Sequence, residues 1–377
     1  MIYVDVSAAV HAKAGIGRYA GSLAGALAVE RPDRLALFYN CAGAAQLPDE
    51  LGCVPSRTIR AGYKPWRLAV WAGHLAGLRF NRLVPGAGLF HATEHLLPPL
   101  GDLPTVLTVH DMIFKRFPQH QKRLNYWYLN STMPLYCQRA DAIITVSEAS
   151  KRDIVTDYGL DPEKITVIYE AASSNFCPVT ASVVDQVRAR YHLPDRYLIH
   201  VGTIEPRKNL TRLVEALKDL RDEELCIPLV VVGGKGWLYE SFFQRLETLE
   251  MDDAVCFPGY VPDDDLAALY SGATATIMPS VYEGFGLPVL ESMACGTPVL
   301  ASNSSSLPEL GGKAAHYFDP YDTVAIAASI RAMWIDTDWQ AEMRRRGLEQ
   351  AARFSWARAA AETLAVYDRT IATKGDH

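Results

Sequence analysis

The sequence lacks an excess of basic residues, a membrane-length apolar run and paired cysteines. Its 377 residues carry a net charge of −6, whereas general nucleic-acid binding usually goes with a basic balance. No run reaches the ~18 apolar residues that a membrane span requires. We therefore expect neither a nucleic-acid partner nor a transmembrane helix, and any basic site must be local.

The seven cysteines, at positions 41, 53, 137, 177, 226, 256 and 295, include no CxxC pair. Their number is odd, and the first residues, MIYVDVSAAV, lack the basic region and long apolar run of a signal peptide. We expect reduced thiols, no structural zinc and a cytoplasmic location, with contact to the inner face of the membrane left open.

What the sequence has is a regular alternation of short apolar runs and longer helical stretches. A chain of 377 residues suits two domains of ~150–200 residues better than one core. The runs are apolar on both faces, as in parallel strands covered by helices on two sides. In the first half they are Ile2–Val6, Leu35–Tyr39, Leu89–Ala92, Val106–Val109, Ala142–Val146 and Ile165–Tyr169.

The segment Glu170–Pro194 interrupts this alternation with small and polar residues, and a second series of strands follows it. The second series is Tyr197–Val201, Leu229–Val232, Val255–Phe257, Thr274–Met278 and Val299–Ala301. The pattern predicts an α/β protein of two Rossmann-like domains facing across a cleft. We expect domains at 1–175 and 176–355, and a last helix at 356–377 that crosses back to the first domain.

The most unusual stretch is the loop and helix between the strand Thr274–Met278 and Pro298. Ligands of open α/β sheets bind at the carboxyl ends of the strands, where this loop lies. Its residues Gly284, Phe285, Gly286 and Leu287 can turn backbone N–H groups toward an anion at the following helix N-terminus. Two acids flank it: Glu283 could hold sugar hydroxyls, and Glu291 could accept hydrogen bonds from a ribose. The ordinary alternative makes Glu283 a solvated loop acid and Glu291 a helix surface charge.

Two adjacent cations, Arg207 and Lys208, follow the strand Tyr197–Val201 and precede a helix. The helix dipole opposes positive charge at this end, so the pair is locally unfavourable unless an anion sits between the two side chains. The surrounding residues lack the GxxxxGK[ST] frame of a P-loop. A plain solvated pair is the alternative.

In the first half, Gly15 and Gly17 follow the first strand and open a helix. The stretch Gly15–Ala20 fits the dinucleotide pattern GxGxxA, which is a weak signal on its own. The second strand ends in Tyr39 and Asn40, without the acid that would hold an NAD ribose. An NAD-dependent oxidoreductase is therefore a weaker alternative.

His110 and Asp111 end the strand Val106–Val109, at the edge where the cleft is expected. A histidine beside an aspartate is also a common structural hydrogen-bonded pair, and this alternative stays open.

The stretches around Arg207 and Glu283 resemble retaining glycosyltransferases of family 4, which have the GT-B fold. The family's E-x7-E element matches Glu283 and Glu291 within GFGLP and ACGTP, and its basic pair matches Arg207 and Lys208. Many members carry an arginine directly after the strand's glycine, where this sequence has Thr203. The resemblance covers nearly the whole chain and is densest over residues 197–312.

The resemblance implies roles for these residues. Arg207 and Lys208 would bind the donor diphosphate, and His110 would contact the donor sugar beside Glu283. Gly15 and Gly17 would lie near the phosphates and acceptor, and backbone groups at Tyr260 and Val261 would meet the base. Glu309 matches a recurrent acid of structural role. Because side chains and a helix dipole bind the phosphates, neither a catalytic metal nor a cofactor is expected.

Two stretches of the first half, 63–71 and 115–128, mix aromatic residues with lysine and arginine. Such mixtures suit a surface near anionic lipid headgroups, and they equally suit helix packing with extended Lys and Arg side chains. The family resemblance favours a glycan or lipid-linked acceptor, and with it a membrane surface as a further partner.

The function predicted from the sequence is retaining transfer of a sugar from a nucleoside diphosphate. GTIEPRKN and YEGFGLPVLE look most like bacterial mannosyl- and rhamnosyltransferases of polysaccharide assembly, so GDP-mannose is the expected donor. Besides the oxidoreductase, a catalytically idle subunit that binds nucleotide-sugar and docks at the membrane stays an alternative.

Overall fold

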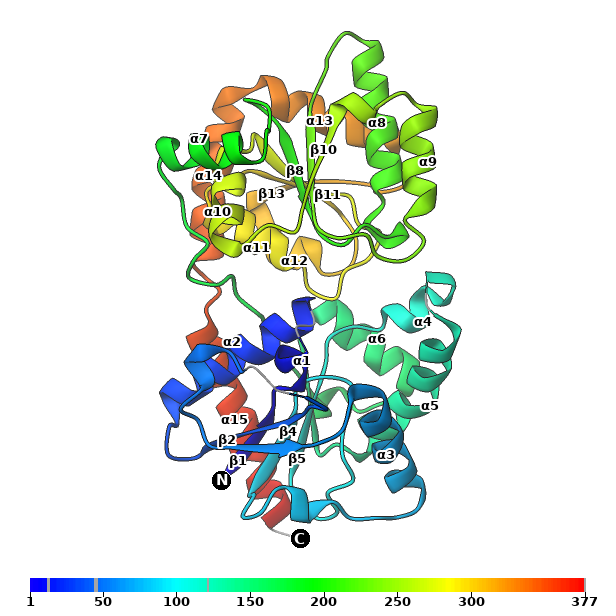
Figure 1. Cartoon of the computed structure of the whole chain (residues 1–377), viewed down its shortest axis with the longest axis vertical. Coiled ribbons are helices and arrows are strands. Elements are labelled where there is room, and N and C mark those ends of the chain that lie inside the picture. Colours follow the sequence, from blue (N-terminus) through cyan, green and yellow to red (C-terminus); the bar gives the residue numbers. More distant parts are fainter. Residues whose placement is uncertain (12–13, 44–46, 121, 376–377) are drawn as a thin grey trace. The chain divides into compact units, whose positions relative to one another are not determined.

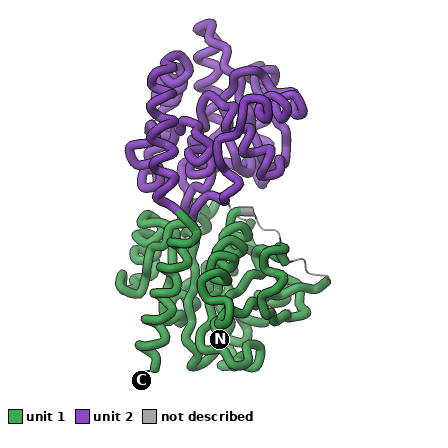
Figure 2. Tube along the Cα trace, turned by 90° about the vertical axis from the view of Figure 1, so that its left-hand side faces the viewer, with its two compact units in different colours: residues 1–170, 355–377 green, residues 171–354 purple. Residues whose placement is uncertain are grey.

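The computed structural model describes residues 1–11, 14–43, 47–120 and 122–375. The chain forms two compact units, Met1–Glu170 with Ser355–His377 and Ala171–Phe354 (Figure 2). The first break follows Glu170, a few residues before the join expected near residue 175. The second unit is therefore continuous in sequence, while the first is built from both ends of the chain.

The first unit contains a sheet of seven parallel strands in the order β3-β2-β1-β4-β5-β6-β7. The pairing is in register along β1, where Val4 lies opposite both Leu37 and His91. The strands are β1 Ile2–Asp5, β2 Leu35–Asn40, β3 Ser56–Ile59, β4 Leu89–Ala92, β5 Thr105–Val109, β6 Ala142–Thr145 and β7 Ile165–Val167.

Helices cover this sheet in two groups. Residues of α3, α5 and α6 share a core with one face of the sheet, and α2 packs along α15, which also contacts β5 and β6 (Figure 1). The C-terminal helix is thus part of the first unit. The helices are α1 Ser7–Val10, α2 Ala14–Glu30, α3 Tyr63–Leu75, α4 Ile113–Arg116, α5 Arg123–Arg139, α6 Glu148–Tyr158 and α15 Trp356–Gly375.

The second unit contains a sheet of six parallel strands in the order β10-β9-β8-β11-β12-β13. The strand order reverses between β8 and β11, which are neighbours in the sheet. Ligands of such sheets bind beyond the carboxyl ends of the strands at this point. The strands are β8 Leu198–Val201, β9 Leu229–Val232, β10 Val255–Gly259, β11 Ala275–Met278, β12 Val299–Ser302 and β13 Ala315–Phe318.

One face of the second sheet shares a core with α8, α9 and α13, and the other face packs against α7 and α10. Figure 1 shows α8 and α9 together on one side of this unit and α7 and α10 on the other. The helices are α7 Ala181–Arg190, α8 Leu210–Asp222, α9 Glu240–Thr248, α10 Asp263–Gly272, α11 Leu287–Ala294, α12 Leu307–Gly311, α13 Thr323–Ile335 and α14 Thr337–Ala351.

The predicted α/β class with two parallel sheets is confirmed, but the strands β3 and β13 and the helix α7 are among the elements that were missed. β3 and β13 are edge strands, and Ser56, Arg57 and Thr58 of β3 are exposed, so they lack a two-faced apolar pattern. Helix α7 lies in the segment Glu170–Pro194, which was interpreted as an interruption of the alternation. Along the described chain, no helix is both long and apolar enough to cross a membrane.

Candidate active site

The turns after β8 and β11 bring the two sequence-predicted motifs of the second unit together. After β8, Arg207 and Lys208 lie in a 3-10 turn, Pro206–Lys208, rather than at the start of α8 itself. Asn209 follows in a left-handed conformation with φ of 58°. Its side-chain Nδ2 donates to the Pro279 carbonyl at 3.0 Å and to the Pro320 carbonyl at 2.7 Å, which fastens the turn to the residues that follow β11 and β13.

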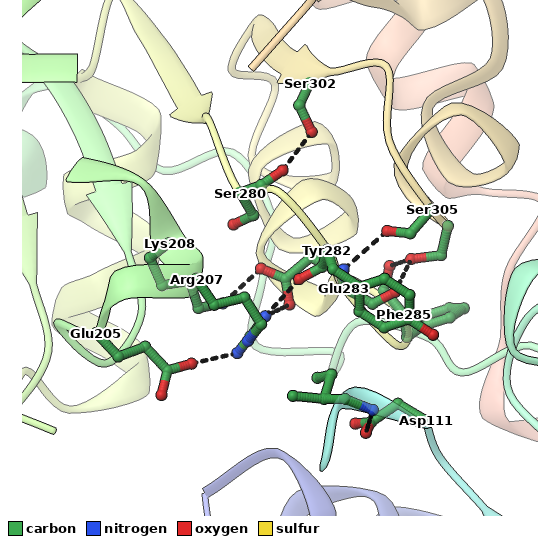
Figure 3. A network of polar contacts seen from close by, with 12 residues as sticks. Asp111, Glu205, Arg207, Lys208, Ser280, Tyr282, Glu283, Phe285, Ser302 and Ser305 are labelled. Atoms are coloured by element: carbon green, nitrogen blue, oxygen red, sulfur yellow. Dashed lines mark hydrogen bonds and ion pairs between the residues drawn. The ribbon is translucent and has the colours of Figure 1, made fainter. Parts of the chain in front are cut away.

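The carboxylate of Glu283 bridges the two cations (Figure 3). Arg207 Nη1 donates to Oε2 and Lys208 Nζ donates to Oε1, both at 2.6 Å. Arg207 also donates to Glu205 Oε1 at 2.5 Å and to the Tyr282 carbonyl at 2.7 Å. The anion expected between the two cations is therefore present in this structure as a side chain.

This cluster is buried, so the attraction between its opposite charges must offset the free-energy cost of removing them from water. Glu283 is 6% exposed and Lys208 is 8% exposed. Burial alone would raise the pKa of Glu283, but the charges of Arg207 and Lys208 lower it to about 2. Burial lowers the pKa of Lys208, against the opposing effect of Glu283. Because the pKa of Glu283 is depressed, its stabilising effect is present above pH 4.5 and is lost as the pH falls through about 2.

A buried ion pair is weak evidence for a stabilising role, because an apolar core is often as stable. Strongly perturbed pKa values at the carboxyl ends of parallel strands are instead typical of functional sites. The solvated alternatives for Arg207–Lys208 and for Glu283 are wrong, since the chain buries Glu283 and Lys208 and pairs all three side chains.

The glycine loop between Glu283 and α11 is fixed by two serines that the sequence analysis did not single out. The Glu283 amide donates to Ser305 Oγ at 2.7 Å (Figure 3), and Ser306 Oγ donates to the carbonyls of Glu283 and Phe285. Gly286 has a φ of 118°, and a Cβ there would lie 2.8 Å from Leu307 Cδ2. The only sequence signal for these serines is the polar run SNSSS after β12.

Glu291 lies in α11 and is buried, at 1% exposure. The Tyr270 hydroxyl donates to its Oε2 at 3.1 Å. The alternative of a surface helix charge is therefore wrong for this residue. Its contact with a ribose stays a prediction.

The residues expected near the base follow β10. Tyr260 is 84% exposed, whereas Val261 is 3% exposed and packs in the core with α10. Packing alone explains the nearby Gly233, because a Cβ at this position would lie 2.2 Å from the Gly202 carbonyl oxygen. Base binding by these residues stays a prediction.

In the first unit, His110 follows β5 and is paired with a residue that the sequence did not indicate. Its Nε2 lies 2.9 Å from the Thr93 carbonyl oxygen, and its Nδ1 lies 3.6 Å from Glu170 Oε1. Asp111 Oδ1 accepts instead from the Ile113 amide at 2.9 Å. The proposed His110–Asp111 structural pair is thus wrong, because the carboxylate at ion-pair distance is Glu170, 60 positions along the chain.

Gly15 and Gly17 lie in the first turns of α2. A Cβ on Gly17 would lie 2.8 Å from the Ala8 carbonyl oxygen, so this glycine allows α2 to pack against α1. Around Gly15 there is space for a Cβ. Neither observation decides whether they approach phosphates, which stays a prediction.

Two parallel sheets, with an ionic cluster at the strand-order reversal of the second, fit the GT-B architecture that the sequence predicts. Residues 14–176 match the family described as Glycosyltransferase Family 4, and residues 186–353 match the one described as Glycosyl transferases group 1. The O-antigen chain mannosyltransferase B of Escherichia coli is 32% identical over 94% of this chain and 95% of its own. The chain belongs to glycosyltransferase family 4.

Other comparisons agree with this family and with its fold. The serotype-specific mannosyltransferase WbdA of Escherichia coli is 31% identical over 70% of this chain, which corresponds to 33% of WbdA. The solved structure of Anabaena HepE in complex with UDP and glucose aligns over 97% of this chain and 99% of its own, with a TM-score of 0.75 at 18% identity. That level of identity supports the fold alone. The oxidoreductase alternative has no support from these comparisons.

Proposed function

We propose that this glycosyltransferase moves mannose from GDP-mannose to a glycan or lipid-linked glycan acceptor, with retention of configuration. The observation that carries the proposal is the buried bridge between Glu283, Arg207 and Lys208 at the carboxyl ends of β8 and β11. The choice of mannose is supported by the relative named O-antigen chain mannosyltransferase B, which is similar over almost its whole length.

In the proposed mechanism, the donor diphosphate replaces Glu283 between the two cations. Arg207 and Lys208 then stabilise the charge that develops on the leaving group, together with the amides of Gly284–Leu287. The released Glu283 carboxylate is free to accept hydrogen bonds from hydroxyls of the donor sugar. As the bond between the anomeric carbon and the diphosphate oxygen breaks, the acceptor oxygen bonds to that carbon on the same face, and its proton passes to the leaving diphosphate.

The proposal is tested by incubating the protein with a panel of nucleotide sugars and lipid-linked acceptors. Mass spectrometry of the products should show one added hexose with GDP-mannose and none with the other donors. Transfer from a different donor would overturn the choice of GDP-mannose. Donor binding without any transfer would favour the catalytically idle subunit.

Replacing Glu291 by glutamine should weaken the binding of GDP and GDP-mannose alike. The expected loss is on the order of 1.5–3 kcal/mol, because a hydrogen bond to a charged group is lost from the nucleotide itself. Calorimetric titration with GDP measures it. The matched control is Tyr270→Phe, which removes a hydroxyl that donates to Glu291 while keeping the charge of Glu291. Unchanged GDP affinity in Glu291→Gln would remove this residue from the ribose site.

Transfer should continue in EDTA, because the cations proposed to act on the diphosphate are side chains. Among the described residues, no group of three or more His, Cys, Asp or Glu side chains is arranged to hold a metal ion. Initial rates with and without EDTA are the measurement. Loss of turnover in EDTA that Mg²⁺ or Mn²⁺ restores would contradict the metal-free mechanism.

A membrane surface is proposed as a partner of the first unit. Helices α3 and α5 pack together through Arg67, whose guanidinium lies 3.8 Å over the Tyr128 ring and donates to Asn125. The chain neighbours of these residues face outward: Leu68 is 57% and Leu124 is 88% exposed. Tyr128 therefore serves the packing of the two helices. Other apolar side chains of these helices are exposed to solvent, and exposed cations lie near them in sequence: Leu68, Leu75, Leu124 and Trp127, with Lys64, Lys122 and Arg123.

The protein should co-sediment with vesicles that contain anionic lipid and should do so less in high salt. The double change Leu124→Glu and Trp127→Glu should reduce the bound fraction several-fold, since it removes exposed apolar area and adds negative charge. Val324→Glu, at a 74% exposed position of α13 in the other unit, is the control. Equal sedimentation of the double variant and the wild type would refute this surface.

A further inference from the structure

Both ring nitrogens of His110 face hydrogen-bond acceptors. Nε2 lies 2.9 Å from the carbonyl oxygen of Thr93, which has no proton to donate, so Nε2 must carry a hydrogen. Nδ1 lies 3.6 Å from Glu170 Oε1, at ion-pair distance, so the second nitrogen faces a carboxylate oxygen. The two partners together fit a ring that is protonated on both nitrogens.

The ring is also held in place by its packing. The Tyr19 ring meets it edge-on, with centroids 4.6 Å apart and planes at 90°. The Tyr19 hydroxyl shares a hydrogen bond with Thr108 Oγ1 at 3.1 Å, and Thr108 is bonded to His91 Nε2 at 2.8 Å. His91 Nδ1 in turn lies 2.6 Å from the Tyr367 hydroxyl of α15. A buried chain thus fixes Tyr19, and with it the plane of His110.

The charged and titratable groups around His110 favour its protonated form. Burial lowers the pKa of His110, but the charge and hydrogen bonding of Glu170, the Thr93 carbonyl and the charge of Asp111 together raise it above its ordinary 6.5. On β4, burial and the neighbouring His110 lower the pKa of His91 to about 3, so His91 is neutral. Burial raises the pKa of Tyr19, on α2, so its hydroxyl is also neutral.

We propose that His110 acts in the transfer reaction as a fixed imidazolium cation, and that Glu170 is the positioning residue that keeps it charged. The inference rests on the proposed function, and it assigns a role to Glu170, which lies outside the motifs around Arg207 and Glu283. With a hydrogen on both nitrogens, His110 has no lone pair with which to take the proton of the acceptor hydroxyl. It offers a ligand its ring carbons and a positive charge, which suits an electron-rich sugar oxygen or phosphate.

The two roles for His110 predict opposite pH dependences. A cation is active below its pKa, so kcat should fall as the pH rises through the pKa of His110. A general base is active when neutral, so kcat would rise over the same range. Replacing Glu170 by glutamine removes one neighbouring negative charge, which should shift the alkaline limb to lower pH by about one unit.

The test pairs a titration that needs no substrate with a pH–rate profile. Histidine side-chain NMR of the whole protein follows the His110 signals, identified by their loss in His110→Gln. Wild-type His110 should titrate above 6.5 with hydrogen on both nitrogens, and Glu170→Gln should lower that midpoint. Glu163→Gln, an exposed acid of the same unit, is the matched control and should leave the midpoint unchanged.

A midpoint below 6.5 in the wild type, or the same midpoint in Glu170→Gln, would overturn the proposal. So would a kcat that rises with pH through the His110 midpoint. Failure of the proposed function would give a different result: transfer from GDP-mannose would be absent, while the NMR titration of His110 would still follow the prediction. Glu170→Asp, which keeps the charge, should restore part of the shift, whereas a merely structural loss in Glu170→Gln would not respond to charge.

Discussion

Replacing Lys208 by alanine should lower kcat by about 10²–10³-fold, the loss typical of removing one preorganised group that stabilises developing charge. The charge on the diphosphate grows as the glycosidic bond breaks, so a fixed cation matters more in the transition state than in the ground state. The affinity for free GDP should fall as well, because Lys208 Nζ, which donates to Glu283, is one of the two cations proposed to bind the diphosphate. Steady-state transfer and GDP titration measure both effects.

Lys218→Ala is the matched control for this variant. Lys218 lies on α8, the helix that follows the Arg207–Lys208 turn, and pairs with Asp222 on the surface. Its replacement should leave kcat and GDP affinity unchanged. Wild-type kcat in Lys208→Ala, with circular dichroism showing a folded chain, would exclude Lys208 from the reaction.

Replacing Glu283 by glutamine should destabilise the protein and abolish most of the transfer activity, yet leave GDP binding intact or stronger. Removing one partner of a buried ion pair costs about 3–5 kcal/mol, because the remaining charges stay buried without compensation. In this variant Arg207 and Lys208 lose the carboxylate that both contact at 2.6 Å. GDP supplies the missing negative charge, so it should raise the melting temperature of Glu283→Gln more than that of the wild type.

Denaturant unfolding and melting curves with and without GDP test this expectation, and Glu215→Gln is the control. Glu215 pairs with Arg245 at 2.8 Å, but their side chains are 27% and 41% exposed, so its loss should cost less than about 1 kcal/mol. If Glu283→Gln loses GDP affinity as severely as Lys208→Ala, the division between a sugar-binding carboxylate and a diphosphate-binding lysine is wrong.

Most strands that the sequence predicted are buried on both faces, although the partly exposed edge strands β7 and β10 were also predicted. All four residues of β9 and β11 are buried, and such continuous apolar runs are typical of parallel sheets. The prediction failed at β3, where Ser56 and Thr58 are exposed at the edge of the sheet. A run of apolar residues therefore identifies a strand, whereas backbone pairing by polar residues such as those of β3 leaves no such run.

For the site, the sequence indicated Glu283, Arg207 and Lys208 but not that they contact one another. Their proximity depends on β8 and β11 being neighbours in the sheet, which no local pattern specifies. The same holds for Glu170 and His110, which meet only because β5, β6 and β7 are adjacent. The alternatives of a solvated Glu283 and a solvated Lys208 fail because the two opposite charges pair, which allows both side chains to be buried.

The return of α15 to the first unit bears on the order in which the protein can fold during synthesis. Residues 171–354 leave the ribosome before α15, so the second unit has its whole chain while the first lacks a helix. Until then the surfaces of α2, β5 and β6 that α15 covers are open, and His91 has no Tyr367 to bond. The unit that is translated first is therefore completed last.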